Sequence, residues 1–279
     1  MPVNVLSEAI ERCIHLVVLS PHLDDAALSC GGLIAHAASR TKVTVATLFT
    51  EAGGAPYTLS TRRYLSQVGA DSAQALYQQR RAEDRAALEP KSITCVHAGL
   101  TDAMFRRRPV KATRRLAAHL LPELAHIYPI YRLHLTSGRI AAADAATLQD
   151  ADDFIQRLAD SDRHLLVAPL GVGGHVDHVL ARSAAERSGA PVVYYSDFPY
   201  NQRSPLPEDF IERNGLVETE FFEFSTARDE LIRAYRTQVH AMFRGGSIPA
   251  VPEAFYVPGD RAKLSSNDWD IPGMVRSKL

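Results

Sequence analysis

Cysteine is scarce in this chain, and the spacing of its cysteines excludes two kinds of site. The 279 residues hold three cysteines, Cys13, Cys30 and Cys95, and no pair of them has the CxxC spacing. An odd and widely separated set indicates neither a disulfide framework nor a zinc site built from thiolates. We therefore expect a protein of the reducing cytoplasm, with its cysteines in or beside core elements.

Long apolar runs and an excess of one charge are also missing. No apolar stretch approaches the roughly 20 residues that a membrane-spanning helix needs. The N-terminal run, which follows Glu8 and Glu11, lacks the form of a secretory signal. The formal net charge is -1, which argues against nucleic acid or an anionic membrane as the main partner. No repeat or linker interrupts the chain, so we expect one domain over residues 1–279, and we predict no oligomeric state.

The sequence does contain an alternation of strand-like and helix-like segments. Apolar runs rich in β-branched residues predict strands at 13–20, 43–50, 93–97, 165–170 and 192–195. Helices are expected at 26–36, 74–88, 110–126, 146–159, 176–188 and, with Thr226 as N-cap, 226–243. Between and after them we expect a polar loop at 56–70, an edge strand or hairpin at 216–224 and an irregular C-terminal tail. This order predicts an α/β, Rossmann-like fold, in which a mostly parallel sheet carries helices on both faces.

A histidine and two adjacent aspartates directly follow the first predicted strand. Pro21 ends that strand, and His22, Asp24 and Asp25 come next. Open α/β sheets bind their ligands at the C-terminal ends of the strands. Neighbouring carboxylates repel each other unless a cation or hydrogen-bond donors offset their charge. We therefore interpret this stretch as half of a metal-hydrolase site.

The segment after the predicted strand at 165–170 supplies a matching half. Residues 173–178 read Gly-Gly-His-Val-Asp-His, and His175 and His178 lie three residues apart, on one face of a helix. An HxxH pair alone is common on solvated helices. Both clusters, however, follow strands and lead into helices, so a doubly wound sheet would bring them to the same edge.

The residue types of the two halves suit a catalytic zinc ion, which takes three ligands from histidines and carboxylates and leaves a position for water. His22, Asp25 and one of the two later histidines would complete such a set, and other divalent ions are compatible with it. Zinc lowers the pKa of a bound water to about 7, and Asp24, next to a ligand, is the candidate base. A protonated histidine held by Asp177 could stabilise the oxyanion of an acyl substrate.

Two motifs, residues 21–25 (Pro-His-Leu-Asp-Asp) and 174–178 (Gly-His-Val-Asp-His), resemble those of the PIG-L (LmbE-like) family of zinc-dependent N-deacetylases. Weaker similarity is present at residues 47–50, 80–84, 99–102 and 195–200. The resemblance thus covers about residues 12–245, and it departs from the family at Leu23, where members usually have Pro. It implies a hydrolase that removes the acetyl group from an N-acetylglucosamine-type amino sugar or conjugate, releasing acetate and a free amine.

The resemblance also implies roles for individual residues. The implied zinc ligands are His22, Asp25 and His178. The implied catalytic residues are Asp24 as general base, His175 as the group that stabilises the oxyanion or protonates the amine, and Asp177 as its orienting partner. Arg80 and Asp102 resemble positions that hold sugar hydroxyls, although such an Arg is often solvated and such an Asp is often a turn former.

Other polar and aromatic residues admit both a functional and a structural interpretation. They are Arg106, Arg107 and Arg108 (an anion grip or a solvated loop), Tyr194, Tyr195 and Tyr200 (a sugar-sized pocket or core packing) and His240 (the site or packing). His15 and His97 lie in predicted strands, and we expect both to be structural histidines rather than ligands.

Three alternatives to an amino-sugar deacetylase stay open. The first is a metal hydrolase of another N-acyl small molecule, such as a natural-product intermediate. The second is a Rossmann-like nucleotide-binding or sensor protein without turnover, which would need the glycine-rich phosphate cradle that the first strand lacks. The third is a sugar-binding pseudoenzyme, which is disfavoured because every catalytic position of the family pattern is filled.

Overall fold

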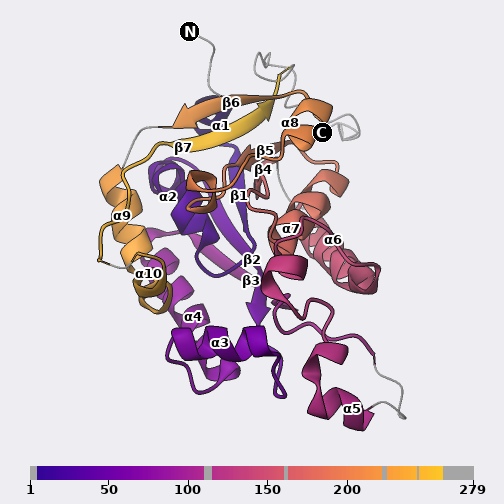
Figure 1. Cartoon of the computed structure of the whole chain (residues 1–279). Coiled ribbons are helices and arrows are strands. Elements are labelled where there is room, and N and C mark those ends of the chain that lie inside the picture. Colours follow the sequence, from indigo (N-terminus) through magenta and orange to yellow (C-terminus); the bar gives the residue numbers. More distant parts are fainter. Residues whose placement is uncertain (1–4, 110–114, 160–162, 222–224, 244, 260–279) are drawn as a thin grey trace, which may run out of the picture.

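The computed structural model describes residues 5–109, 115–159, 163–221, 225–243 and 245–259. In this part of the chain, seven strands form one sheet in the order β3-β2-β1-β4-β5-β7-β6 (Figure 1). Neighbouring strands from β3 to β5 run parallel, whereas β7 pairs antiparallel with both β5 and β6. The strands are β1 (His15–Ser20), β2 (Val43–Glu51), β3 (Thr94–Thr101), β4 (His164–Pro169), β5 (Val192–Tyr195), β6 (Leu216–Phe221) and β7 (Glu253–Pro258).

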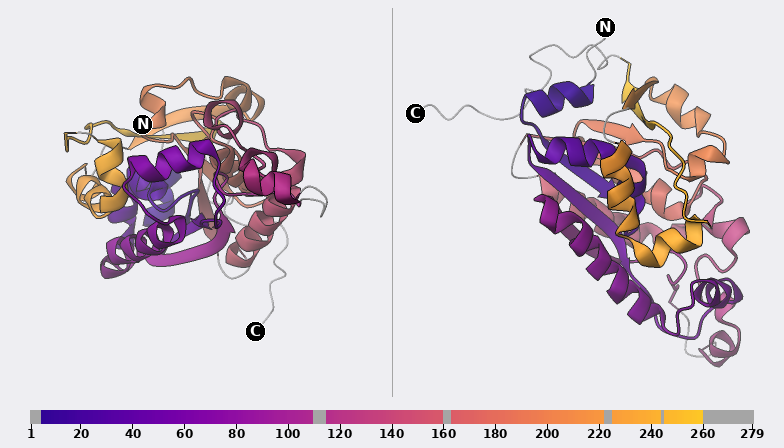
Figure 2. Two further views of the ribbon diagram at one scale, coloured as in Figure 1. Left: turned by 60° about the horizontal axis from the view of Figure 1, so that its bottom comes forward. Right: turned by 90° about the vertical axis from the view of Figure 1, so that its left-hand side faces the viewer.

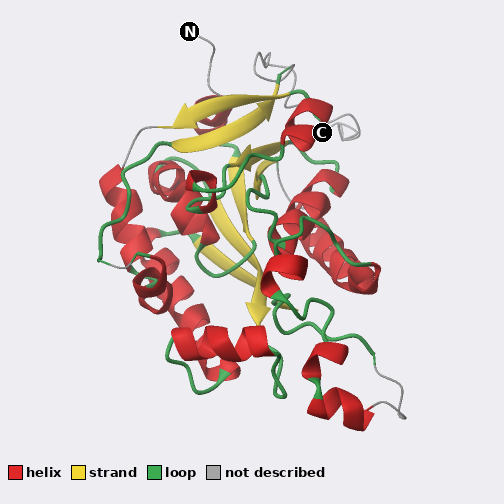
Figure 3. Cartoon of the chain, viewed as in Figure 1, coloured by secondary structure: helices red, strands yellow, loops and turns green. Residues whose placement is uncertain are grey.

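Helices cover both faces of this sheet (Figures 2 and 3). They are α1 (Val5–Glu11), α2 (Asp25–Ala38), α3 (Leu59–Gln67), α4 (Ala73–Leu88), α5 (Arg115–Leu120), α6 (Ala145–Ala159), α7 (Val176–Arg187), α8 (Glu208–Arg213), α9 (Ser225–Arg233) and α10 (Arg236–Met242). The predicted fold class, α/β with a mostly parallel sheet and helices on both faces, is confirmed. No helix within the described ranges is long and apolar enough to cross a membrane.

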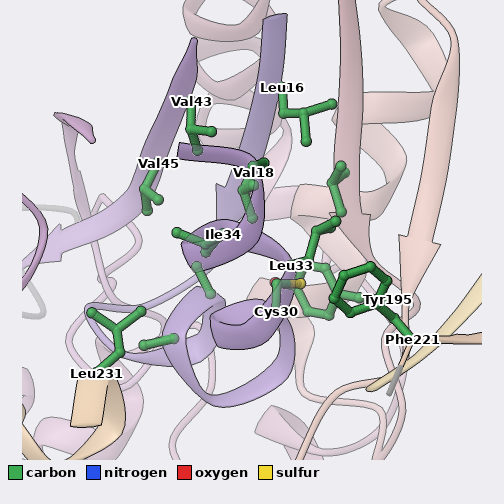
Figure 4. Packing of buried hydrophobic residues seen from close by; sticks show 14 of the residues in the cluster. Leu16, Val18, Cys30, Leu33, Ile34, Val43, Val45, Tyr195, Phe221 and Leu231 are labelled. Atoms are coloured by element: carbon green, nitrogen blue, oxygen red, sulfur yellow. The ribbon is translucent and has the colours of Figure 1, made fainter. Parts of the chain in front are cut away.

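Alternation along the central strands divides the core into two layers. Leu16 and Val18 of β1 belong to the layer under α1, α2 and α9, whereas Val17 and Leu19 belong to the layer under α6 and α7. Figure 4 shows the first layer, in which α2 residues such as Ile34 pack against the strand residues. Every residue of β1 is buried, and its middle, residues 16–19, is the continuous apolar run that a central parallel strand requires.

Several expectations for the secondary structure are wrong. The expected loop at 56–70 contains α3, whose N-cap Thr58 accepts a hydrogen bond from the N–H of Thr61. This helix has few apolar residues, so the apolar periodicity that predicts a helix is not visible in its sequence. The expected irregular tail contains β7, inserted between β5 and β6. The expected helix at 110–126 is reduced to α5 and a 3-10 turn at Pro122–Leu124, with residues 110–114 outside the described part.

The expected helix at 226–243 is two helices. α9 already begins at Ser225, so Thr226 lies inside the helix and is not its N-cap. The break falls at Tyr235, whose hydroxyl donates a hydrogen bond to the carboxylate of Asp84 on α4 at 2.7 Å. A tertiary contact thus overrides the local helix-forming sequence at this point.

The sheet brings the two sequence motifs together. β1 and β4 are parallel neighbours, paired from His15 with His164 to Val18 with Val167, so the residues after both strands leave from the same edge. Since β1 also pairs with β2 on its other side, this is the point where connections diverge and α/β proteins bind ligands. The turn after β4 requires glycine at Gly174, because φ is 65° there and a Cβ would lie 3.2 Å from the backbone of a neighbouring turn.

Candidate metal centre and active site

Three predicted ligands converge at the shared edge of β1 and β4. Ligand atoms of His22, Asp25 and His178, which we call the first cluster, lie within 4.8 Å of one another. The Asp25 Oδ2 atom is 3.1 Å from His22 Nδ1 and 3.3 Å from His178 Nε2. Asp25 opens α2 and His178 lies in the first turn of α7, so two helices that follow neighbouring strands place these side chains face to face.

His178 presents one nitrogen to the cluster and is held by the other. Its Nδ1 contacts Asp197 Oδ1 at 2.6 Å, so this nitrogen carries a proton, and Nε2 is the nitrogen that would offer a lone pair to an ion. His178 Nε2 is buried and has no hydrogen-bond partner. An imidazole held in this way by a carboxylate is typical of a metal ligand.

Asp197 was not assigned a role from the sequence. Its Oδ2 accepts hydrogen bonds from the N–H groups of Gly171 and Val172, both at 2.8 Å, so the carboxylate is fixed by the turn that follows β4. The available signal was its place after β5, the next strand of the sheet, at the same edge.

Asp24 and Asp25, although adjacent, differ in their electrostatic surroundings. Burial, followed by the charge of Asp25, raises the pKa of Asp24 to about 7. Burial acts on Asp25 in the same direction, but His178 and the hydrogen bond from His22 outweigh it and hold the pKa of Asp25 well below its usual range. Asp24 is the N-cap residue of α2, yet its side chain makes no capping hydrogen bond, which leaves that carboxylate available for proton transfer.

The carboxylate of Asp177 holds His22, which differs from the expected pairing with His175. Its Oδ2 lies 3.1 Å from His22 Nε2 and accepts the N–H of Ala103 at 2.9 Å, while Oδ1 forms an ion pair with Arg106. The physical reason is that His175 is the N-cap residue of α7 and folds back over its own helix, where its Nδ1 accepts the backbone N–H of Asp177 at 3.2 Å.

His175 lies beside the first cluster as a neutral group. Its ring centroid is 5.0 Å from that of His22 and 5.5 Å from that of His178. Burial, followed by the charge of His22, lowers the pKa of His175 to about 3. With Nδ1 accepting a hydrogen bond, the single proton of this imidazole is on Nε2.

Arg106 is neither a grip for an anion nor part of a solvated loop, the two interpretations that the sequence left open. The side chain is 4% exposed and pairs with Asp144 at 2.9 Å as well as with Asp177. It therefore neutralises buried carboxylates behind His22. Arg107 and Arg108 donate to backbone carbonyls of neighbouring loops.

Arg80 and Asp102 border the first cluster. Asp102 Oδ2 is 3.5 Å from His22 Nε2 and accepts a hydrogen bond from the hydroxyl of Tyr77 at 2.5 Å. The Arg80 guanidinium is buried over the rings of Tyr64 and Tyr77, and its charge acts on Asp24.

Of the three tyrosines and His240, whose roles the sequence left open, only Tyr200 is seen to contact a residue of the first cluster within the described part of the chain. The Tyr200 ring lies 5.6 Å from that of His178. Tyr194 packs on Phe210, Tyr195 is buried with its hydroxyl bonded to the Leu19 carbonyl, and His240 is exposed. Tyr131, in a π-helical turn at Tyr131–Leu135, lies 6.4 Å from His175 by ring centroids and had no signal in the sequence.

Residues 17–188, more than half of the chain, match the family described as PIG-L, GlcNAc-PI de-N-acetylase. The chain belongs to the PIG-L family. This PIG-L member is 29% identical to 2'-N-acetylparomamine deacetylase of Streptomyces fradiae over 232 residues, an alignment covering 77% of this chain and 69% of that protein. The predicted family is thereby confirmed, and with it a hydrolase of the deacetylase type.

Solved structures support the fold of this PIG-L member. Teicoplanin deacetylase Orf2, in its zinc-inhibited form, is 22% identical with a TM-score of 0.66, covering 87% of this chain and 97% of that chain. N,N'-diacetylchitobiose deacetylase from Pyrococcus horikoshii is 12% identical with a TM-score of 0.50, covering 93% of this chain and 90% of that chain. At these identities the likeness shows a common fold. The first cluster could hold a divalent metal ion, since two imidazoles and a carboxylate converge on one point.

Proposed function

We propose that this PIG-L member is a zinc-dependent deacetylase that hydrolyses the N-acetyl group of an amino sugar within a larger conjugate. The observation that carries the proposal is the first cluster together with Asp24, a carboxylate beside it that takes part in no capping hydrogen bond. The curated relative, named as a deacetylase of 2'-N-acetylparomamine, supports an amino-sugar substrate.

The donor set fits zinc. Two imidazole nitrogens and one carboxylate oxygen are the ligand types of catalytic zinc sites, which keep a fourth position open. The clearest sign is Nε2 of His178, which is buried, makes no hydrogen bond and faces Asp25 Oδ2 at 3.3 Å, since an ion between the two atoms would satisfy both. When bound, zinc would supply a Lewis acid that acidifies water and polarises the acetyl carbonyl.

Asp24 would move the protons of the reaction. A carboxylate with a pKa near 7 takes a proton from the attacking water and can return it to the departing amine. Arg80, whose charge acts on Asp24, would keep part of this group ionised near neutral pH.

His175 would stabilise the negative charge on the acetyl oxygen. The sequence suggested a protonated histidine for this task, but the low pKa of His175 favours a neutral donor that uses its Nε2–H. A preorganised donor of this kind is worth about 10²–10³-fold in rate in a comparable oxyanion site.

Arg80, Asp102, Tyr131 and Tyr200 surround the first cluster and would contact the sugar and its conjugate. We propose likewise that one deacetylase domain spans residues 1–279. A cytoplasmic location stays a prediction.

The test is acetate release from a panel of N-acetylglucosaminyl conjugates and other N-acyl amines, with chelator-stripped and zinc-restored protein. We expect release from amino-sugar conjugates that zinc restores and chelator abolishes. Release confined to non-sugar amides would favour the alternative hydrolase, and sugar binding by calorimetry without any acetate release would indicate a pseudoenzyme.

A further inference from the structure

A second group of ligand-type side chains lies on the edge strand β3, which β2 separates from β1. Its position along the sheet is given by His97, which pairs with Thr47 of β2, the partner of Ser20 at the end of β1. Cys95 and His97 are two residues apart on β3 and therefore point to the same face of the sheet. Asp84, on α4, packs over that face, and Figure 2 shows α4 lying along this edge. We call these three residues the second cluster.

Three different ligand atoms meet in the second cluster. His97 Nε2 lies 2.8 Å from Asp84 Oδ2, and Cys95 Sγ lies 3.3 Å from the same oxygen and 3.4 Å from His97 Nε2. A tetrahedral zinc ion with bonds of 2.0–2.3 Å would hold such atoms about 3.3–3.6 Å apart. The cluster is therefore close to zinc-binding dimensions and slightly contracted around its hydrogen bonds.

The carboxylate of the second cluster is oriented from outside. The buried Tyr235, between α9 and α10, donates its hydroxyl to Asp84 Oδ1 at 2.7 Å. That bond leaves Oδ2 directed at Cys95 and His97. Carboxylate ligands of metal sites are commonly held in this way by a second hydrogen bond.

The histidine of the second cluster has the nitrogen that a metal would need. In the absence of an ion, His97 donates its Nε2–H to Asp84 Oδ2 at 2.8 Å, while Nδ1 is buried without a hydrogen-bond partner and is free to take the proton when an ion binds. With the proton on Nδ1, Nε2 would offer its lone pair to an ion.

An ion could reach the second cluster from solvent. The side chains of Asp84 and His97 are buried, the latter 8% exposed, so access would be from the side of Cys95, which is partly exposed. Burial and the Asp84 carboxylate raise the pKa of the Cys95 thiol, with Arg85 and Glu89 as the other charged groups acting on it. Binding would release the thiol proton to solvent and form a metal–thiolate bond.

We propose that Asp84, Cys95 and His97 form a second zinc site, which contains a thiolate and is separate from the first cluster. A site of one thiolate, one imidazole and one carboxylate matches the ligand preferences of zinc and leaves a fourth position for water. The ion would link the edge strand β3 to α4 through Asp84, which follows Arg80 by four residues on that helix. The proposal does not depend on the deacetylase activity.

Cobalt(II) titration of the chelator-stripped full chain tests this site. Thiolate coordination of cobalt produces a charge-transfer band in the near ultraviolet, and the first cluster contains no sulfur. We expect the band in the wild type and in Asp25→Asn, and its loss in Cys95→Ser. Cys13→Ser, which removes an exposed thiol, is the matched control and should keep the band.

Zinc stoichiometry gives an independent measurement. With zinc in excess, we expect two equivalents in the wild type, one in Cys95→Ser and in His97→Gln, and zinc-dependent protection of Cys95 from alkylation. One equivalent in the wild type, with no thiolate band and no protection, would overturn the proposal. This result stands on the wild type alone, even if the variants fail to fold.

Discussion

The two clusters hold similar side chains but differ in what surrounds them. In the first cluster, each imidazole is fixed on its far side by a second carboxylate: Asp177 contacts Nε2 of His22, and Asp197 contacts Nδ1 of His178. The nitrogen that His178 turns toward Asp25 has no hydrogen-bond partner. The geometry of this cluster is thus imposed by its surroundings.

The second cluster is held largely by its own hydrogen bonds. Asp84, Cys95 and His97 bond to one another, and one outside group, Tyr235, is seen to orient them. A metal ion must displace these bonds and a thiol proton before it can bind. The comparison therefore predicts tight binding at the first cluster and weaker, exchangeable binding at the second.

The largest effect is expected from the two adjacent aspartates of the active site. Asp24→Asn should keep zinc and lower kcat by about 10²–10⁴-fold, because it removes a general base. Asp25→Asn should lose zinc from the first cluster, since it removes a ligand, and activity should fall with it. Elemental analysis beside acetate-release kinetics separates the two.

Equal zinc contents in Asp24→Asn and Asp25→Asn would contradict this division of roles. The second cluster supplies an internal control, because neither substitution removes one of its ligands. Its share of the bound metal should be unchanged in both variants.

A smaller effect is expected from Asp197→Asn. One oxygen of Asp197 contacts His178 and the other accepts two backbone N–H groups. The amide of asparagine has only one acceptor oxygen, so it can replace only one of these two sets of contacts. The affinity of the first cluster for zinc should fall about 10–100-fold, the usual cost of losing such an orienting partner. Competition with a chelator of known affinity measures this change.

Asp153→Asn, which alters an exposed carboxylate on α6, is the control for Asp197→Asn. Its zinc affinity should equal that of the wild type. An Asp197→Asn protein that binds zinc as tightly as the control would show that the surroundings of the first cluster do not determine its affinity.

The convergence of the three residues of the first cluster was predictable because each of them follows a strand. His22 and Asp25 come after one apolar run and His178 after another, and parallel strands deliver such residues to one edge. What the pattern could not predict is which carboxylate faces which imidazole. Asp177 holds His22 because His175 is used as a helix cap, a detail of packing rather than spacing.

The second cluster shows where sequence reasoning stops. The alternation of Cys95 and His97 along a strand is visible in the sequence. The lack of a CxxC motif argued against a thiolate site, and the position of His97 in a strand predicted a structural histidine, which the proposed second site would reverse. The third member, Asp84, comes from a helix. Tyr235, which donates a hydrogen bond to Asp84, lies at the break between α9 and α10, which the helix-forming sequence did not reveal. Contacts between distant segments made by single polar residues have no periodic signature.

The smallest effect is expected from Tyr235→Phe. Loss of the hydroxyl removes one buried hydrogen bond to Asp84 and should lower the free energy of unfolding by about 1 kcal/mol. The same change should weaken zinc binding at the second cluster and leave zinc binding at the first cluster unchanged.

Tyr195→Phe is the matched control, because it removes a buried hydroxyl that donates to the Leu19 carbonyl of β1. Denaturant unfolding and cobalt titration of both variants should give similar stabilities, with a weaker thiolate band in Tyr235→Phe alone. If both variants bind cobalt alike, Tyr235 does not orient a ligand, and the difference between the clusters would reduce to their residue types.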